Sequence, residues 1–214
     1  MFRNRTEAGV KLAEKLGQYR DRGDVIVLAL PRGGVVTGFE VARLLNVPLD
    51  VLIVRKIGFP GQEELAAGAV SETGSVVFNR DIMAMGGLSE EFLQREVERQ
   101  KQEIDRRVAL YRSGRGLAGL EGRTVILIDD GVATGATVKA AVAALKQEKL
   151  AKLVLALPVA PPETVNVLRA MVDELVCLET PQYFMAVGAH FQDFTQVTDQ
   201  EVVELLHRSL ARAA

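Results

Sequence analysis

Residues 125–138, with the sequence VILIDDGVATGATV, join an apolar run, two acidic residues and a loop of small residues that leads into a helix. The apolar run predicts a buried strand that delivers Asp129 and Asp130 at its carboxyl end, where open α/β sheets bind ligands. Backbone N–H groups of such a loop, together with the N-terminus of the following helix, favour a phosphate group. The stretch therefore predicts a phosphate site beside two carboxylates.

The side chains of this stretch indicate what the phosphate is attached to. Thr134 and Thr137 can donate hydroxyl hydrogen bonds to phosphate oxygens, and Gly135 permits a backbone geometry that a side chain would obstruct. The two carboxylates repel phosphate, so they fit hydroxyl groups beside it, and the vicinal hydroxyls of a ribose match them. The stretch contains neither GxxxxGK[ST] nor GxGxxG, which argues against nucleotide hydrolysis and dinucleotide redox chemistry.

The rest of the chain alternates short apolar runs with helical patterns. Strands are predicted at residues 25–30, 49–54, 125–128, 153–157 and 174–178, and helices at residues 35–45, 136–145 and 162–171. Continuous apolar strands alternating with helices are typical of a parallel sheet covered on both faces. We therefore expect an α/β protein with a doubly wound, mostly parallel five-stranded sheet flanked by helices.

Three segments lie outside this alternation. Residues 69–78 are predicted to form a hairpin. Residues 88–112 are predicted to form a long charged helix with Ser89 as its N-cap. Thr198 and Glu201 are predicted to form the capping box of a final helix. We expect a single domain over residues 1–214, with a core at about 21–180 and an insertion at about 58–119. By its charge pattern the long helix is either solvated or a contact with a second subunit.

Composition limits the classes of function. Of the 214 residues 48% are hydrophobic and 25% charged, as in ordinary globular proteins, and the formal net charge of −2 gives no basic face for nucleic acid. No apolar run reaches the ~18 residues of a membrane span. The N-terminus does not resemble a secretory signal, and Cys177 is the one cysteine, so we expect a cytoplasmic protein.

At this point the chain resembles the type I phosphoribosyltransferases, whose signature is a hydrophobic strand, two acidic residues and a small-residue loop ending in TGxT. The resemblance extends to Pro31-Arg32-Gly33-Gly34, which is similar to the family's pyrophosphate loop, and to the basic pair Arg55 and Lys56 after the next strand. Glycines in the first of these segments would expose N–H groups, and Arg32 would supply a fixed charge to a diphosphate.

The resemblance implies 5-phosphoribosyl-1-pyrophosphate (PRPP) as substrate and a divalent cation, Mg²⁺ or Mn²⁺, as cofactor. It assigns the 5′-phosphate to residues of the signature loop, which are Gly131, Val132, Ala133, Thr134, Gly135, Ala136 and Thr137. Asp129 would hold the ribose hydroxyls, and Asp130 would face the incoming base or the developing cation. Both would serve the metal, directly or through water. A homodimer is the expected assembly. The resemblance also implies a lid that closes over the site from between the early strands and the signature, and residues 88–112 occupy that interval.

In this family a hood built from the termini selects the acceptor base. Residues 1–20 and 179–214 are the candidates here, with Tyr183, Phe184, His190 and Phe191 as possible base contacts. Stacking on an aromatic ring would stabilise a base by about 1 to 3 kcal/mol. The same rings could instead form the hood's own core, and His190 could be structural.

Two readings from different classes remain open. The first is an enzyme that transfers phosphoribosyl from PRPP to a purine or pyrimidine base with release of pyrophosphate. The second is a sensor that binds PRPP or a nucleotide on the same fold without useful turnover. A third, weaker reading is a module that acts beside another enzyme.

Overall fold

The structure is a computed structural model and describes residues 1–59, 62–84, 87–117 and 119–213. It consists of two compact units, which we describe separately. The first comprises Met1–Val51, Gly119–Gly135 and Lys149–Ala214, and the second comprises Leu52–Ala118 and Ala136–Glu148. Part of the predicted insertion, at residues 60–61, 85–86 and 118, lies outside the described residues.

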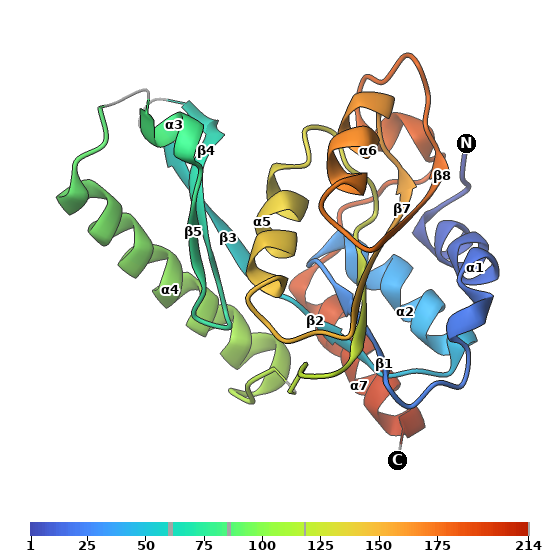
Figure 1. The fold of residues 1–214 in the computed structure, drawn as a ribbon. Helices are drawn as coiled ribbons and strands as arrows, with labels where there is room; N and C mark the ends of the chain where they lie inside the picture. Colours follow the sequence, from blue (N-terminus) through green and yellow to red (C-terminus); the bar gives the residue numbers. More distant parts are fainter. Residues whose placement is uncertain (60–61, 85–86, 118, 214) are drawn as a thin grey trace. The chain divides into compact units, whose positions relative to one another are not determined.

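The first unit contains a parallel sheet of five strands in the order β2-β1-β6-β7-β8 (Figure 1). Its strands are β1 (Val25–Ala29), β2 (Leu49–Val51), β6 (Thr124–Ile128), β7 (Lys152–Val159) and β8 (Glu174–Glu179). Every neighbouring pair is parallel, with Val27 opposite Ile126 at the centre of the sheet. All residues of β1 and β6 are buried, which is why these strands read as uninterrupted apolar runs. The predicted five-stranded parallel sheet is confirmed.

Four α-helices and two short 3₁₀ segments complete this unit. They are α1 (Arg5–Lys15), α2 (Gly33–Leu45), α6 (Pro162–Arg169), α7 (Asp199–Ala213), η1 (Gly17–Tyr19) and η2 (Val187–His190). The chain steps outward from β1 to β2 in one direction and from β7 to β8 in the other. Right-handed crossovers therefore place α2 and α6 on opposite faces of the sheet, as Figure 1 shows.

Helices α1 and α7, which we assigned to the hood, pack against α2. A β-carbon on Gly9 of α1 would lie 2.6 Å from the Thr37 carbonyl oxygen of α2, so glycine permits the close approach of these helices. The predicted capping box is confirmed: Glu201 N–H donates to Thr198 Oγ1 (3.2 Å), and Thr198 N–H donates to Glu201 Oε2 (2.7 Å).

The prediction of one strand over residues 49–54 is wrong. β2 ends at Val51, and the chain then enters the second unit, where β3 (Val54–Phe59) belongs to a different, antiparallel sheet. Between the strands, Ile53 N–H donates to Glu72 Oε1 (2.8 Å), and its carbonyl accepts from Glu72 N–H (3.0 Å). The run looks continuous because Leu52 and Ile53 are buried, although they have left the parallel sheet.

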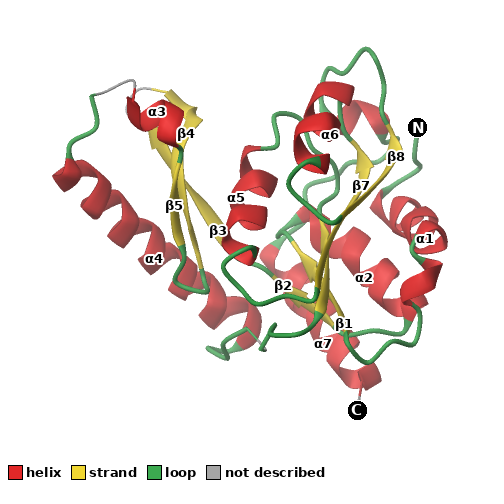
Figure 2. Cartoon of the chain, in the orientation of Figure 1, coloured by secondary structure: helices red, strands yellow, loops and turns green. Residues whose placement is uncertain are grey.

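The second unit is built on a three-stranded antiparallel sheet in the order β3-β4-β5 (Figure 2). Its other elements are β4 (Gln62–Ser71), β5 (Val76–Phe78), α3 (Arg80–Ala84), α4 (Glu90–Arg112) and α5 (Ala136–Leu145). β4 and β5 form the predicted hairpin, with residues 72–74 at its turn.

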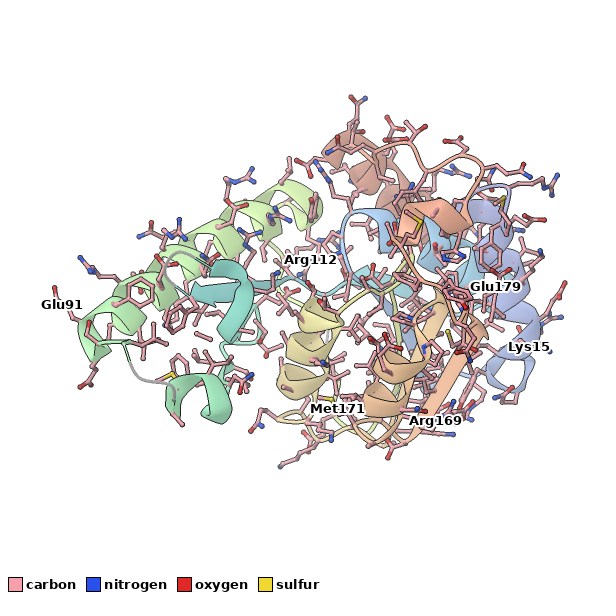
Figure 3. All side chains as sticks on the ribbon, turned by 90° about the horizontal axis from the view of Figure 1, so that it is seen from above. Lys15, Glu91, Arg112, Arg169, Met171 and Glu179 are labelled. Carbon is pink, nitrogen blue, oxygen red and sulfur yellow. The ribbon has the colours of Figure 1, made fainter. Side chains whose placement is uncertain are left out.

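Helix α4, whose ends Figure 3 marks with Glu91 and Arg112, is the predicted long helix. Ser89 Oγ caps it by accepting from Phe92 N–H (3.1 Å). Leu93 and Ile104 are buried against the antiparallel sheet, and the buried Arg112 is paired with Glu72. One face of the helix therefore packs against the sheet of its own unit, and more than half of its residues remain exposed, as predicted.

No helix in the described ranges is long and apolar enough to span a bilayer. Cys177 lies on β8, is partly buried, and has a thiol pKa raised to about 11 by that burial.

Candidate functional site

Two neighbouring strands bring the predicted pyrophosphate loop next to the acidic pair. β1 ends just before Pro31, β6 ends just before Asp129, and Leu30 N–H donates to the Ile128 carbonyl (2.9 Å) between them. A β-carbon on Gly33 would overlap Asp130 Oδ2, and one on Gly34 would lie 3.0 Å from Asp129 Cα. The glycines therefore let the start of α2 approach the acids directly. The exposure of their N–H groups to a diphosphate stays a prediction.

The Pro31-Arg32-Gly33-Gly34 segment is more helical than a loop. α2 begins at Gly33, the Pro31–Arg32 peptide is cis, and Arg32 is the N-cap residue. Arg32 Nη1 lies 4.0 Å from Asp199 Oδ1 with both side chains more than a third exposed, so this pair is loose. Its guanidinium can therefore turn to an anion.

The two carboxyl groups of the acidic pair are partly buried and lie side by side. Burial raises the pKa of Asp129 well above its ordinary value, and the neighbouring charge of Asp130 raises it further. Burial also raises the pKa of Asp130, although its contact with Arg5 acts in the opposite direction. Two such groups favour a cation or a hydrogen-bond donor between them.

Arg5 is a contact of the acidic pair that the sequence did not reveal. Its Nε lies 2.6 Å from Asp130 Oδ2, and the two side chains are only 10% and 14% exposed. Arg5 precedes Asp130 by 125 positions and belongs to no motif, so no local pattern could have indicated this pair.

The signature loop adopts the backbone that its glycines predicted. Gly135 has φ of 75°, a left-handed conformation that disfavours side chains. Thr164 of α6 fixes the loop from outside, because its Oγ1 donates to the Ala133 carbonyl (2.7 Å). Thr164 is a second contact that the sequence did not reveal.

The loop's N–H groups are not equally available to a phosphate. Val132 N–H donates to the Val159 carbonyl (2.9 Å), and its side chain is 4% exposed. The contact of Val132 with the 5′-phosphate stays a prediction. Among the described residues, the N–H groups of Thr134 and Gly135 meet no acceptor, and the Thr134 side chain is exposed. Ala136 and Thr137 open α5 in the second unit, and their phosphate contacts stay a prediction.

We expected Arg55 and Lys56 at the end of a parallel strand, and the structure places them elsewhere. They lie within β3 of the second unit, opposite Val70 and Ala69 of β4. Arg55 Nε donates to Gln100 Oε1 of α4 (3.0 Å) and its guanidinium pKa is lowered, chiefly by burial. Their contact with pyrophosphate stays a prediction.

The hood aromatics mostly contact one another. Phe191 is 6% exposed and lies 5.3 Å from the Phe2 ring and 5.0 Å from the Phe194 ring, centroid to centroid, which leaves no free face for a base. Phe184 stacks on His190 at 5.3 Å. Phe191 is therefore a core residue.

The other hood candidates differ in their surroundings. His190 Nδ1 lies 4.0 Å from Glu179 Oε2, at the end of β8 that Figure 3 marks with Glu179. Tyr183 is 94% exposed. Base contacts by Tyr183, Phe184 and His190 stay a prediction.

The donor set of the site fits a hydrated divalent cation rather than a closed metal centre. In the described part of the chain no cluster of three or more metal-ligating side chains occurs, and Asp129 and Asp130 are two adjacent carboxyls with raised pKa values. Mg²⁺ usually keeps several waters and takes one or two carboxylates plus phosphate oxygens of the substrate. The acidic pair meets that requirement.

Fold and site together define an α/β protein with a doubly wound parallel sheet. The carboxyl edge of this sheet carries an acidic pair, which lies beside the glycine-containing start of α2 and is followed by a glycine-containing loop. Residues 3–192 match the phosphoribosyl transferase domain family, so the chain belongs to that family. Its sheet and flanking helices have the type I phosphoribosyltransferase fold.

Individual relatives support this assignment. A protein of two Mycobacterium tuberculosis strains, provisionally named a phosphoribosyl transferase, is 44% identical over 216 residues, which cover 100% of this chain and 48% of the relative. The chain thus spans about half the length of the curated relatives it matches.

Solved structures resemble this chain over most of its length. The crystal structure of the protein TT1426 from Thermus thermophilus is 45% identical with a TM-score of 0.86, covering 97% of this chain and 98% of that one. The AQ2163 protein of Aquifex aeolicus is 12% identical with a TM-score of 0.53, covering 95% and 85%, and shows likeness of fold alone.

Proposed function

We propose that the protein transfers the 5-phosphoribosyl group of PRPP to a nitrogenous base of the purine or pyrimidine salvage type, with release of pyrophosphate. The observation that carries this proposal is the contact between Gly33-Gly34 and Asp129-Asp130 at the carboxyl edge of the sheet. Two phosphate-type loops beside one acidic pair match a ligand with phosphates on both sides of a diol, and PRPP has that form.

The reaction exchanges one bond at the ribose C1. The bond from C1 to the pyrophosphate oxygen breaks, its electron pair leaves with pyrophosphate, and a base nitrogen supplies the pair for the new C1–N bond. A proton on that nitrogen is released to solvent or to a nearby base. Since C1 develops oxocarbenium character, positioning and charge stabilisation account for most of the catalysis.

Each part of the site has one task in this proposal. The 5′-phosphate is held by the N–H groups of Thr134 and Gly135 and by the Thr134 hydroxyl. The pyrophosphate is held by Arg32 and the start of α2. Asp129 accepts hydrogen bonds from the ribose hydroxyls, and Asp130 faces C1 or the acceptor. Mg²⁺, held by Asp129 and Asp130 directly or through water, would neutralise the pyrophosphate leaving group.

Turnover with a panel of acceptors tests the proposal. The protein is incubated with PRPP, Mg²⁺ and single purine or pyrimidine bases, and the release of pyrophosphate and nucleotide is followed. Nucleotide formation that disappears in Asp129→Asn/Asp130→Asn supports the enzyme. PRPP-dependent thermal stabilisation without turnover on any base would replace it by a PRPP sensor, and no response to PRPP would contradict both.

We further propose that the protein acts in the cytoplasm as a homodimer. The unpaired Cys177, whose thiol pKa is raised by burial, is compatible with a reducing compartment. Light scattering coupled to size-exclusion chromatography tests the assembly, and a mass equal to one chain at micromolar concentration would contradict it.

A further inference from the structure

Arg5 connects three parts of the first unit at the acidic pair. Its Nε lies 2.6 Å from Asp130 Oδ2, and its Nη1 donates to the Thr195 carbonyl (2.8 Å). Its guanidinium carbon lies 3.8 Å from the centroid of the Phe194 ring. Helix α1, the segment after η2 and the end of β6 therefore meet at one guanidinium.

These contacts hold the guanidinium in one orientation. The N–H edge of the guanidinium donates to a carboxylate and a carbonyl, and its plane lies over an aromatic ring. A lysine ammonium could not make these three contacts together. The side chain is 10% exposed, so water does not readily replace any of the three partners. Arg5 is thus a fixed charge rather than a mobile surface residue.

Named donors hold one oxygen of each acid. Asp130 Oδ2 is taken by Arg5, and Asp129 Oδ1 accepts from Asp130 N–H (2.9 Å). The side chains of Asp129 and Asp130 also interact with each other through a hydrogen bond. Arg5 therefore fixes one oxygen of an acidic pair whose two side chains are joined.

The start of α2 lies against the same group. A β-carbon on Gly33 would lie 3.0 Å from Arg5 Nε. The guanidinium consequently lies next to Asp130 and to Gly33, the first residue of α2 and a member of the proposed pyrophosphate site, so it links the two halves of the site.

We propose that Arg5 is a positioning residue, which turns the Asp130 carboxylate toward the ligand and ties the hood segment at Phe194 and Thr195 to it. The kinetic consequences of this inference rest on the proposed function. The effect of Arg5 on PRPP binding can be measured without turnover. Loss of Arg5 leaves Asp130 without its orienting partner and frees Thr195.

A double-mutant cycle separates positioning from general structural support. PRPP affinity with Mg²⁺ is measured by calorimetry for the parent, Arg5→Met, Asp130→Asn and the double variant. We expect Arg5→Met to weaken PRPP binding at least tenfold, and to change it less than twofold when Asp130 is already Asn, because Arg5 acts through that carboxylate. Equal fold-changes in both backgrounds would overturn the proposal.

Two further variants complete the experiment. Arg5→Lys keeps the charge but not the three contacts, so its PRPP affinity should lie between those of the parent and Arg5→Met. If Arg5→Met does not fold, Arg5→Lys takes its place in the cycle. Arg3→Met removes a charge from a side chain that is 75% exposed and paired with Glu7, and should leave PRPP affinity within twofold.

Kinetics distinguish a failure of this inference from a failure of the proposed function. In an active protein, Arg5→Met should lower kcat at least tenfold in addition to raising the KM for PRPP, because a misdirected Asp130 affects the reacting centre. If the parent protein shows no turnover, the proposed function is contradicted, but the double-mutant cycle of PRPP binding still tests the role of Arg5. An unchanged kcat in Arg5→Met would restrict Arg5 to ground-state binding and contradict the positioning of Asp130.

Discussion

Gly33 and Asp130 are packed so closely that a single added methyl group at residue 33 would overlap the carboxylate oxygen Oδ2 of Asp130. The two residues come from different strand–helix connections, and their contact is possible because residue 33 has no side chain. The proposed pyrophosphate and ribose sites are therefore adjacent at one point of the sheet edge.

Gly33→Ala should damage both sites. We expect a loss of about 1 to 3 kcal/mol in the free energy of unfolding, the usual cost of overpacking, because the Asp130 carboxylate must move. PRPP affinity should fall at least tenfold. Gly17→Ala is the control, since a β-carbon there meets nothing within 4 Å and the change should be neutral or slightly stabilising. Denaturant titration and calorimetry give both quantities, and equal behaviour of the two variants would refute the close approach.

Asp129→Asn should stabilise the free protein while abolishing PRPP binding. The folded protein holds a proton on Asp129 more tightly than the unfolded chain does, so this carboxyl lowers stability progressively as pH rises above its ordinary pKa of 3.8. Asparagine removes that penalty. The Tm of the variant should exceed that of the parent by an amount that grows as pH rises above 3.8 and levels off above the raised pKa of the folded protein. A Tm below that of the parent at pH 8 would show that the Asp129 carboxylate is stabilising.

The parts of the fold that the sequence predicts are those set by local patterns. The end of β6 before Asp129, the start of α5 at Ala136 and the capping box at Thr198 follow from apolar runs, small residues and helix-cap chemistry within a few positions. Such signals do not depend on what the rest of the chain does.

The remaining features depend on partners far away in the chain. Phe191 reads as a candidate base contact until Phe2 covers it, and Arg5 has no motif that links it to Asp130. The break between β2 and β3 is hidden because residues on both sides of it are buried, although they belong to different sheets. Periodicity reports burial and cannot say which core buries a residue.

Thr164→Val should loosen the signature loop without unfolding the protein. The hydrogen bond from Thr164 Oγ1 to the Ala133 carbonyl is 2.7 Å long, and the residue is 6% exposed. Its loss should cost about 0.5 to 1.5 kcal/mol in the binding of PRPP or of a nucleoside monophosphate, whose 5′-phosphate uses the same loop. Thr164→Ser keeps the hydroxyl and should retain the affinity of the parent. Calorimetry decides, and equal affinities for the Val and Ser variants would exclude a role for this bond.

Glu103→Gln tests the electrostatics of α4 through their pH dependence. Glu103 accepts from Arg106 and Arg107 (both 2.8 Å), and these contacts lower its pKa to about 2 from 4.5. A carboxylate with a lowered pKa contributes stability that is complete above its unfolded value and is lost as pH falls through the folded value. Since Arg106 is 58% exposed, solvent screening limits the contribution at pH 7 to about 0.5 to 1 kcal/mol.

We expect Glu103→Gln to be less stable by that amount at pH 7, and the difference to shrink as pH falls from 4.5 toward 2. The chain has no Trp, so urea unfolding is followed by circular dichroism at each pH. Glu121→Gln, which removes one partner of an ion pair that is 77% exposed at Glu121, should show no such trend. A difference between Glu103→Gln and the parent that does not change with pH would mean that the side chain acts through packing and not through its charge.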